Sequence, residues 1–96
     1  MKFEWDDAKN RRNLVKHKIS FETAQSVFDD PNHLSLFDRM VDDEERWHAL
    51  GLVDGVLVIL VVHTFQEIDG EEAIRIISAR KATSTERRCY ETGGQE

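Results

Sequence analysis

The chain begins with the pattern of a short strand. Its apolar residues then have the spacing typical of helices over the first third of the chain and the spacing typical of strands over the rest. Phe3 and Trp5 alternate with polar residues, as in a half-buried strand. Asp6 or Asp7 then supplies an N-cap for a helix that buries only a thin apolar stripe. Ser20 caps a second helix, whose apolar residues lie three and four positions apart: Phe21, Ala24, Val27 and Phe28.

Beyond Pro31, which ends the second helix, the apolar pattern is that of strands. Four strands are predicted, the first beginning at Leu34 and the others over residues 44–53, 56–65 and 73–79. The dipeptides Asp54-Gly55 and Asp69-Gly70 precede the last two strands and are typical of hairpin turns. Thr83 and Glu86 have the spacing of a capping box, so a short C-terminal helix is predicted to begin there.

This order of strand, two helices, four strands and helix predicts an α+β fold with an antiparallel sheet, rather than a doubly wound parallel one. Ninety-six residues are enough for one small core. We expect residues 1–91 to form a single domain and residues 92–96 a flexible tail. Helices would cover one face of the sheet and leave the other partly open to a ligand.

Cysteine usage and hydropathy indicate a cytoplasmic protein. The single cysteine, Cys89, cannot form an internal disulfide, and the polar first residues lack the apolar core of a secretory signal. The longest apolar run, residues 56–62, is too short to cross a bilayer as a helix. We therefore expect no membrane partner.

The net charge of −6 is unevenly distributed. Residues 1–20 contain six Lys and Arg against three Asp and Glu, whereas residues 21–72 contain two against thirteen. Residues 73–96 contain five against three. Two basic ends could meet as one positive face for a phosphate-bearing ligand, with the acidic middle facing another partner; the alternative is that solvated charges segregate by chance.

The candidate chemistry is metal-free cleavage of RNA. The four histidines are scattered and Cys89 has no C-x-x-C partner, so neither a metal site nor another cofactor is expected. No phosphate-binding loop or nucleophile elbow is present. RNA cleavage needs a base for the 2′-hydroxyl, cations for the phosphorane charge and an acid for the leaving 5′ oxygen.

Several candidates for proton transfer also have a structural interpretation. His17 ends the first helix, where it could be catalytic or could bond a terminal carbonyl. Arg46 and His48 share one strand face, where they could line a site or pair with acids, and Arg46 is the better candidate. Glu45 or Glu44 could be a base, although a solvated acidic loop is the first assumption. A further histidine, in the most apolar strand, is more typical of a satisfied core residue than of a catalyst: His63.

The last strand and helix are rich in cations. Arg75 and Arg80 would point to opposite faces of a regular strand, unless the strand is bulged or has ended before Arg80. We expect Arg80 to bind phosphate. Lys81, Arg87 and Arg88 could bind RNA, although Lys81 could be only a solvated neighbour, while Tyr90 could stack on a base, donate a proton or anchor the helix.

An ordered set of short motifs runs along nearly the whole chain: Phe3-Glu4-Trp5-Asp6, Lys16-His17, Ser20-Phe21, Glu45-Arg46 with Gly51, Arg75 to Arg80, and Glu86-Arg87-Arg88. Together they resemble the BrnT-type toxins of bacterial type II toxin–antitoxin pairs. One position departs from that pattern, since Lys18 stands where the family usually has glycine after Lys-His. If this position needs a positive φ, Lys18 weakens the end of the first helix.

The resemblance implies a RelE-like fold and a metal-independent endoribonuclease that inhibits translation. It also implies neutralisation by a BrnA-like antitoxin, whose ribbon-helix-helix domain dimerises and binds operator DNA. It supplies no catalytic residues, so their roles are inferred from the sequence: His17, Glu45, Arg46, Arg75, Arg80 and Tyr90 for catalysis, and Lys9, Lys16, Lys81, Arg87 and Arg88 for RNA binding. The alternatives are a non-catalytic binding module or co-repressor acting through the antitoxin complex, and a purely structural domain.

Overall fold

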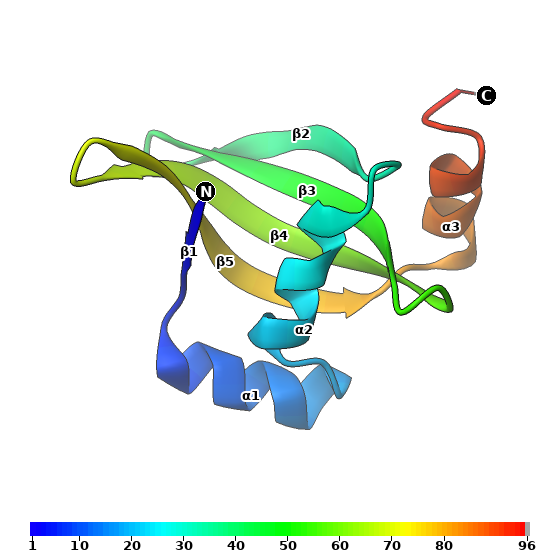
Figure 1. Cartoon of the computed structure of the whole chain (residues 1–96), viewed down its shortest axis with the longest axis horizontal. Helices are drawn as coiled ribbons and strands as arrows, with labels where there is room; N and C mark the ends of the chain where they lie inside the picture. The colour runs from blue at the N-terminus through cyan, green and yellow to red at the C-terminus, as the bar shows by residue number, and fades with distance from the viewer. Residues whose placement is uncertain (96) are drawn as a thin grey trace.

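A five-stranded sheet organises residues 1–95, the part of the chain that this computed structural model describes (Figure 1). The strands are β1 (Lys2–Glu4), β2 (Leu34–Val41), β3 (Glu44–Val53), β4 (Leu57–Ile68) and β5 (Glu71–Lys81). Their order in the sheet is β1-β5-β4-β3-β2. Strands β2 to β5 pair antiparallel as predicted, but β1 pairs parallel with β5, so the sheet is mixed rather than wholly antiparallel.

The helices begin at the predicted caps. They are α1 (Asp7–His17), α2 (Phe21–Gln25) with the 3₁₀ turn η1 (Ser26–Asp29), and α3 (Ser84–Glu91). Asp6 and Ser20 accept hydrogen bonds from the backbone of the first turns of α1 and α2. Thr83 and Glu86 form both hydrogen bonds of a capping box at the start of α3. The predicted order of elements is therefore confirmed.

Positive φ angles occur at the end of α1 and in the hairpin turns. Lys18 has φ 62° and its N–H donates to the carbonyl of Leu14, so the position has the left-handed conformation that glycine favours. Asp54-Gly55 and Asp69-Gly70 also have positive φ angles at both residues, as tight hairpin turns require.

The two faces of the sheet are covered to different extents. The face that carries Ile59, Val61 and His63 of β4 packs against α2 and η1, and we call it the helix face. Gly51 lies on this face, where a Cβ would approach a Val27 side-chain carbon to 2.6 Å. The opposite face carries Leu60, Val62 and Thr64, and we call it the open face. Within residues 1–95, only α3 covers it, through a cluster that contains Leu50, Leu60, Cys89 and Tyr90.

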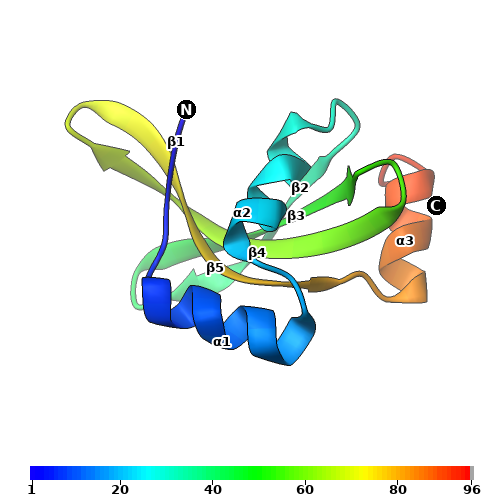
Figure 2. The ribbon, with the colours of Figure 1, turned by 60° about the horizontal axis from the view of Figure 1, so that its bottom comes forward.

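α1 lies along the edge of β5 that β1 leaves free (Figure 1). The side chain of Asn13 is buried between them and forms hydrogen bonds with the backbone of Ala79. α2 and α3 thus pack on opposite faces of the sheet, while β1 and α1 lie along its β5 edge (Figure 2). No helix of the described residues covers the end of the open face beyond α3.

The chain continues past α3 in hydrogen-bonded turns. Gly94 donates its N–H to the carbonyl of Cys89, and Gln95 donates to Thr92. Glu96, the last residue of the predicted flexible tail, lies outside the described residues. None of the helices within residues 1–95 has the length and apolar character needed to cross a membrane.

Candidate functional site

A bulge in β5 brings Arg75 and Arg80 to the same face of the sheet. Arg75 pairs with Thr64 and Arg80 pairs with Leu60, two residues of β4 that point the same way. Because Ser78 pairs with Val62 and Ile76 with His63, Ile77 is the extra residue. Both arginines therefore lie on the open face, as the sequence predicts for a bulged strand but not for a regular one.

A second bulge, in β2, turns another arginine to this face. Phe37 pairs with Trp47 and Arg39 pairs with Arg46, so Asp38 is the extra residue between them. In a regular strand Arg39 would share the face of Phe37; in the bulged strand it shares the face of Arg46. Arg39 is not among the site residues predicted from the sequence, although Arg39 and Arg46 are the two cations of the acidic segment 21–72.

Three arginines consequently cross the open face in one line. The register that pairs Trp47 with His63 puts Arg46 beside Thr64, which in turn pairs with Arg75. We call Arg39, Arg46 and Arg75 the arginine row. Neighbouring strands are about 5 Å apart, so Arg39 and Arg46 are adjacent, whereas Arg75 is two strands from Arg46 with Thr64 between them. Like charges directly opposite each other destabilise a sheet unless something neutralises them.

The three guanidinium groups differ in their partners. Arg39 is close to Asp38, with Nε 3.6 Å from Oδ2, and Arg75 is close to Glu4, with Nη1 3.3 Å from Oε1. The Nε of Arg46 is buried and has no hydrogen-bond partner among the described residues. A buried donor without a partner is costly.

His48 lies on the open face one step from the arginine row. It is two residues from Arg46 on β3 and pairs with Val62. Its Nε2 is 3.4 Å from Oδ2 of Asp38, and both side chains remain partly exposed. An imidazole oriented by a carboxylate is a group suited to proton transfer. The sequence left two alternatives for His48, lining a site or pairing with an acid. In the structure His48 does both, since it lines the open face and lies close to Asp38.

Arg80 forms a bidentate ion pair with the capping box of α3. Its Nη1 and Nη2 donate to Glu86 Oε1 and Oε2 at 2.7 and 3.0 Å, and Nη1 also donates to the carbonyl of Lys81. The hydrogen bonds from Arg80 lower the pKa of Glu86 to about 2, and the same pair raises the pKa of Arg80. Arg80 therefore stabilises the start of α3. The other cations of this region are exposed: Lys81, Arg87 and Arg88.

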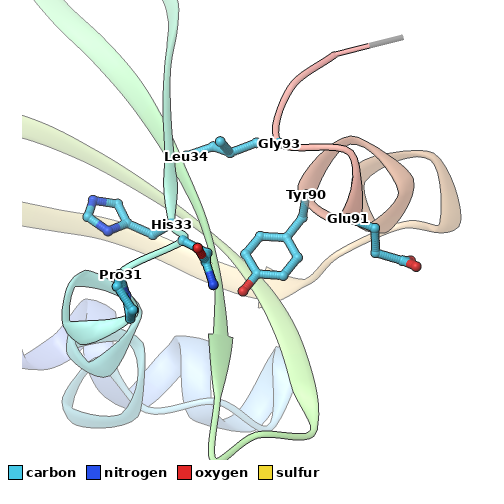
Figure 3. A pocket seen from close by; sticks show the side chains of 7 residues that line it. Pro31, His33, Leu34, Tyr90, Glu91 and Gly93 are labelled. Carbon is cyan, nitrogen blue, oxygen red and sulfur yellow. The ribbon is translucent and has the colours of Figure 1, made fainter.

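Tyr90 anchors α3 to the turn after η1. Figure 3 shows its ring pointing from α3 toward the segment that carries Pro31 and His33. Its hydroxyl donates to Oδ2 of Asp30 at 2.6 Å, which raises the pKa of Tyr90 to about 12. Asp30 also accepts from the N–H of Leu52 at 2.8 Å. A phenol held in this way is a poor proton donor at neutral pH.

Glu45 lies on the opposite face from Arg46. Successive residues of β3 alternate between faces, and Glu45 shares the helix face with Trp47, whose Nε1 donates to it at 3.2 Å. Glu44, the alternative base, instead accepts from Nε2 of Gln66 at 3.5 Å. The structure does not bring Glu45 together with the arginine row.

The predicted RNA-binding residues of the first helix line a shallow groove of about 360 Å³ between α1 and β5. Its cationic side is formed by Lys9, Arg12, Lys16 and His17. Its other side is Ile77 and Ser78, which follow Arg75 along β5. The groove thus opens beside one end of the arginine row.

His63 is a core residue, as predicted, but its polar atoms are not satisfied. Its side chain is fully buried against the rings of Phe28 and Phe65, at centroid distances of 5.1 and 5.0 Å. Neither ring nitrogen has a hydrogen-bond partner among the described residues, and burial lowers the pKa to about 4. Within residues 1–95, no group of three His, Cys, Asp or Glu is arranged to hold a metal ion.

Comparisons with known proteins identify the family and the fold of this chain. Residues 5–86 match the family described as "Ribonuclease toxin, BrnT, of type II toxin-antitoxin system". The chain is similar to the crystal structure of the Brucella abortus ribonuclease toxin BrnT, with 27% sequence identity and a TM-score of 0.59. That match covers 88% of this chain and 99% of the Brucella chain. A comparison with curated proteins found no match.

Proposed function

This chain belongs to the BrnT family of ribonuclease toxins of type II toxin–antitoxin systems, and we propose that it is an endoribonuclease that cleaves RNA without a metal ion. Membership of the family implies an RNA substrate and a cognate antitoxin. The finer proposal is that attack by a 2′-hydroxyl cuts the chain, that this cleavage inhibits translation, and that the antitoxin is of the ribbon-helix-helix type and carries the complex to operator DNA.

The two strand bulges are the observation that best supports this mechanism. Without them Arg39 and Arg75 would not share the open face with Arg46. We propose that the arginine row binds the scissile phosphate and stabilises the phosphorane charge. Guanidinium groups suit this task because they stay protonated and offer paired donors to phosphate oxygens. Arg46 would then turn its Nε, which is buried and has no partner among the described residues, toward the RNA.

Proton transfer falls to His48 in this proposal. Neutral His48, oriented by Asp38, takes the proton of the 2′-hydroxyl, and the 2′ oxygen attacks phosphorus. The imidazolium that forms returns a proton to the 5′ oxygen as its bond to phosphorus breaks. The products are a 2′,3′-cyclic phosphate and a 5′-hydroxyl end. Of the bases predicted from sequence, Glu45 faces the other way and Tyr90 is bonded to Asp30, whereas His17 remains an alternative in the α1 groove.

The groove beside α1 would guide the rest of the RNA strand. Lys9, Lys16 and His17 line it together with Arg12, and it opens next to the strand that carries Arg75. Contacts of this kind bind the backbone without reading its sequence, so affinity should fall as salt rises. Arg87 and Arg88, exposed on α3, could extend the path beyond the open face.

The direct test is cleavage of RNA by purified protein in the presence of a chelator, with and without ribosomes. We expect new 5′-hydroxyl ends, and growth arrest when the chain is expressed without its antitoxin. His48→Gln should slow cleavage far more than His17→Gln does. Intact RNA in both preparations, with a stable antitoxin complex on operator DNA, would instead support a co-repressor.

A further inference from the structure

An exposed aromatic surface lies on the helix face, beyond the end of η1. Phe37, Trp47 and Phe65 come from three adjacent strands and meet edge to face, with centroids 5.6 Å apart in both contacts. Phe37 is 53% exposed, Phe65 is 42% exposed, and nearby Met40 is 56% exposed. We call these four residues the aromatic stripe. Figures 1 and 2 show that the β4–β5 hairpin beside it projects past α1 and α2.

The aromatic stripe is bordered by carboxylates. Glu45 pairs with Met40 and accepts from the indole of Trp47. Glu67 lies two residues beyond Phe65 on the same face and pairs directly with Glu72 of β5. Both are exposed. Among the ion pairs of the described residues, none involves Glu45, Glu67 or Glu72.

This surface is the electrostatic opposite of the arginine row. On the open face two arginines oppose each other across β2 and β3; on the helix face two glutamates oppose each other across β4 and β5. Like charges at such positions are unfavourable until a partner of the other sign arrives. RNA would bring more negative charge to the aromatic stripe, so its charge disfavours RNA and favours cationic groups.

We propose that the aromatic stripe is a docking surface for a protein segment that carries apolar side chains together with Lys or Arg. The proposal rests on the toxin function above, because the segment belongs to the antitoxin. Apolar side chains of the segment would cover Phe37, Met40 and Phe65, where well-packed aromatic contacts contribute most binding energy. Its cations would pair with Glu67 and Glu72. The stripe and the arginine row lie on opposite faces, so this contact leaves the RNA site itself uncovered.

The test is a titration with the protein encoded by the gene beside that of this chain, followed by tryptophan fluorescence. The chain has two tryptophans, so Trp5→Phe leaves Trp47 as the single reporter in the stripe. We expect its emission to change on binding. In this background Glu67→Lys and Phe65→Ala should each weaken binding by about tenfold or more. The matched controls, Glu91→Lys and Val56→Ala, change exposed residues elsewhere and should leave the dissociation constant unchanged.

Glu67 is exposed in a hairpin, so Glu67→Lys remains informative if Phe65→Ala fails to fold. An unchanged dissociation constant in the stripe variants, or no binding at all, would contradict the proposal. Self-association in sedimentation that Phe65→Ala abolishes would also contradict it, because the stripe would then bind a second copy of the chain. A loss of RNA affinity in Phe65→Ala would contradict it as well. Cleavage by the free chain reports separately on the proposed function, since the stripe variants should cut RNA at the parent rate.

Discussion

Asn13 and Ala79 exchange two hydrogen bonds across 66 positions of sequence. The amide nitrogen of Asn13 donates to the carbonyl of Ala79 at 2.8 Å, and its oxygen accepts from the Ala79 N–H at 3.1 Å. The same nitrogen donates to the carbonyl of Ile19 at 2.8 Å. The Asn13 side chain thus forms the hydrogen bonds that a neighbouring strand would form with the edge of β5. It also holds α1 and its cationic groove beside β5.

Replacing this side chain should destabilise the whole domain. Asn13→Ala leaves the N–H and carbonyl of Ala79 and the carbonyl of Ile19 without partners, so we expect the free energy of unfolding to fall by about 2–4 kcal/mol. Urea denaturation measures it. Asn32→Ala is the control, because Asn32 is exposed and bonds Asp30 through its backbone N–H. Equal losses in the two variants would contradict the role given to Asn13.

Lys18→Gly should stabilise the protein. Lys18 has φ 62°, where a β-carbon is strained, and relief of that strain exceeds the added entropy of glycine in the unfolded chain. We expect a gain of roughly 0.5–1 kcal/mol in the free energy of unfolding. Lys18→Ala removes the charge but keeps the β-carbon, so it should show no gain. A gain of the same size in Lys18→Ala would assign the effect to charge instead.

Acid should unfold this protein partly through His63. Its pKa is lowered from 6.5 to about 4 in the folded state, so the unfolded chain binds the proton more strongly. Stability should therefore fall as pH decreases from 6.5 toward 4, by at most about 1.4 kcal/mol per pH unit. Denaturation at several pH values above 4.5 measures this slope. We expect His63→Leu to flatten it; a slope unchanged in His63→Leu would exclude His63 as the cause.

The ion pair of Arg80 should matter for folding more than for cleavage. Arg80→Ala and Glu86→Ala should each lower the free energy of unfolding by roughly 1 kcal/mol, and the double variant should lose little more. Because the pKa of Glu86 is lowered from 4.5 to about 2, this stabilisation persists above pH 4.5 and disappears as pH falls through 2. Both variants should cut RNA when folded. If Arg80→Ala abolishes cleavage and Glu86→Ala does not, Arg80 binds the phosphate, as predicted from the sequence.

The elements of this fold could be predicted because their signals are local. Ser20, the Thr83 capping box and the Asp54-Gly55 turn each depend on a few neighbouring residues, and all three are confirmed. Lys18 is similar, since its positive φ follows from its place at the end of α1. The parallel pairing of β1 could not be predicted, because the choice of partner strand depends on the rest of the sheet.

The candidate site was harder to predict, because the two bulges decide which side chains share a face. Alternation assigns Arg39 to the face of Phe37, and nothing nearby marks Asp38 as the extra residue. For Arg75 the sequence left both faces open, and only the pairing with β4 selects one. Glu45 is different, since alternation alone separates it from Arg46.

The most direct test of the arginine row is the single-turnover rate of RNA cleavage in chelator by Arg46→Ala. Circular dichroism should first show that the variant is folded. We expect its rate to fall by about a hundredfold or more, as when one charge-stabilising donor is removed from an active site. Arg11→Ala, which removes an exposed cation of α1 outside the row, should cleave at the parent rate. Cleavage by Arg46→Ala at the parent rate, or an equal loss in both variants, would contradict the assignment of the phosphate to the arginine row.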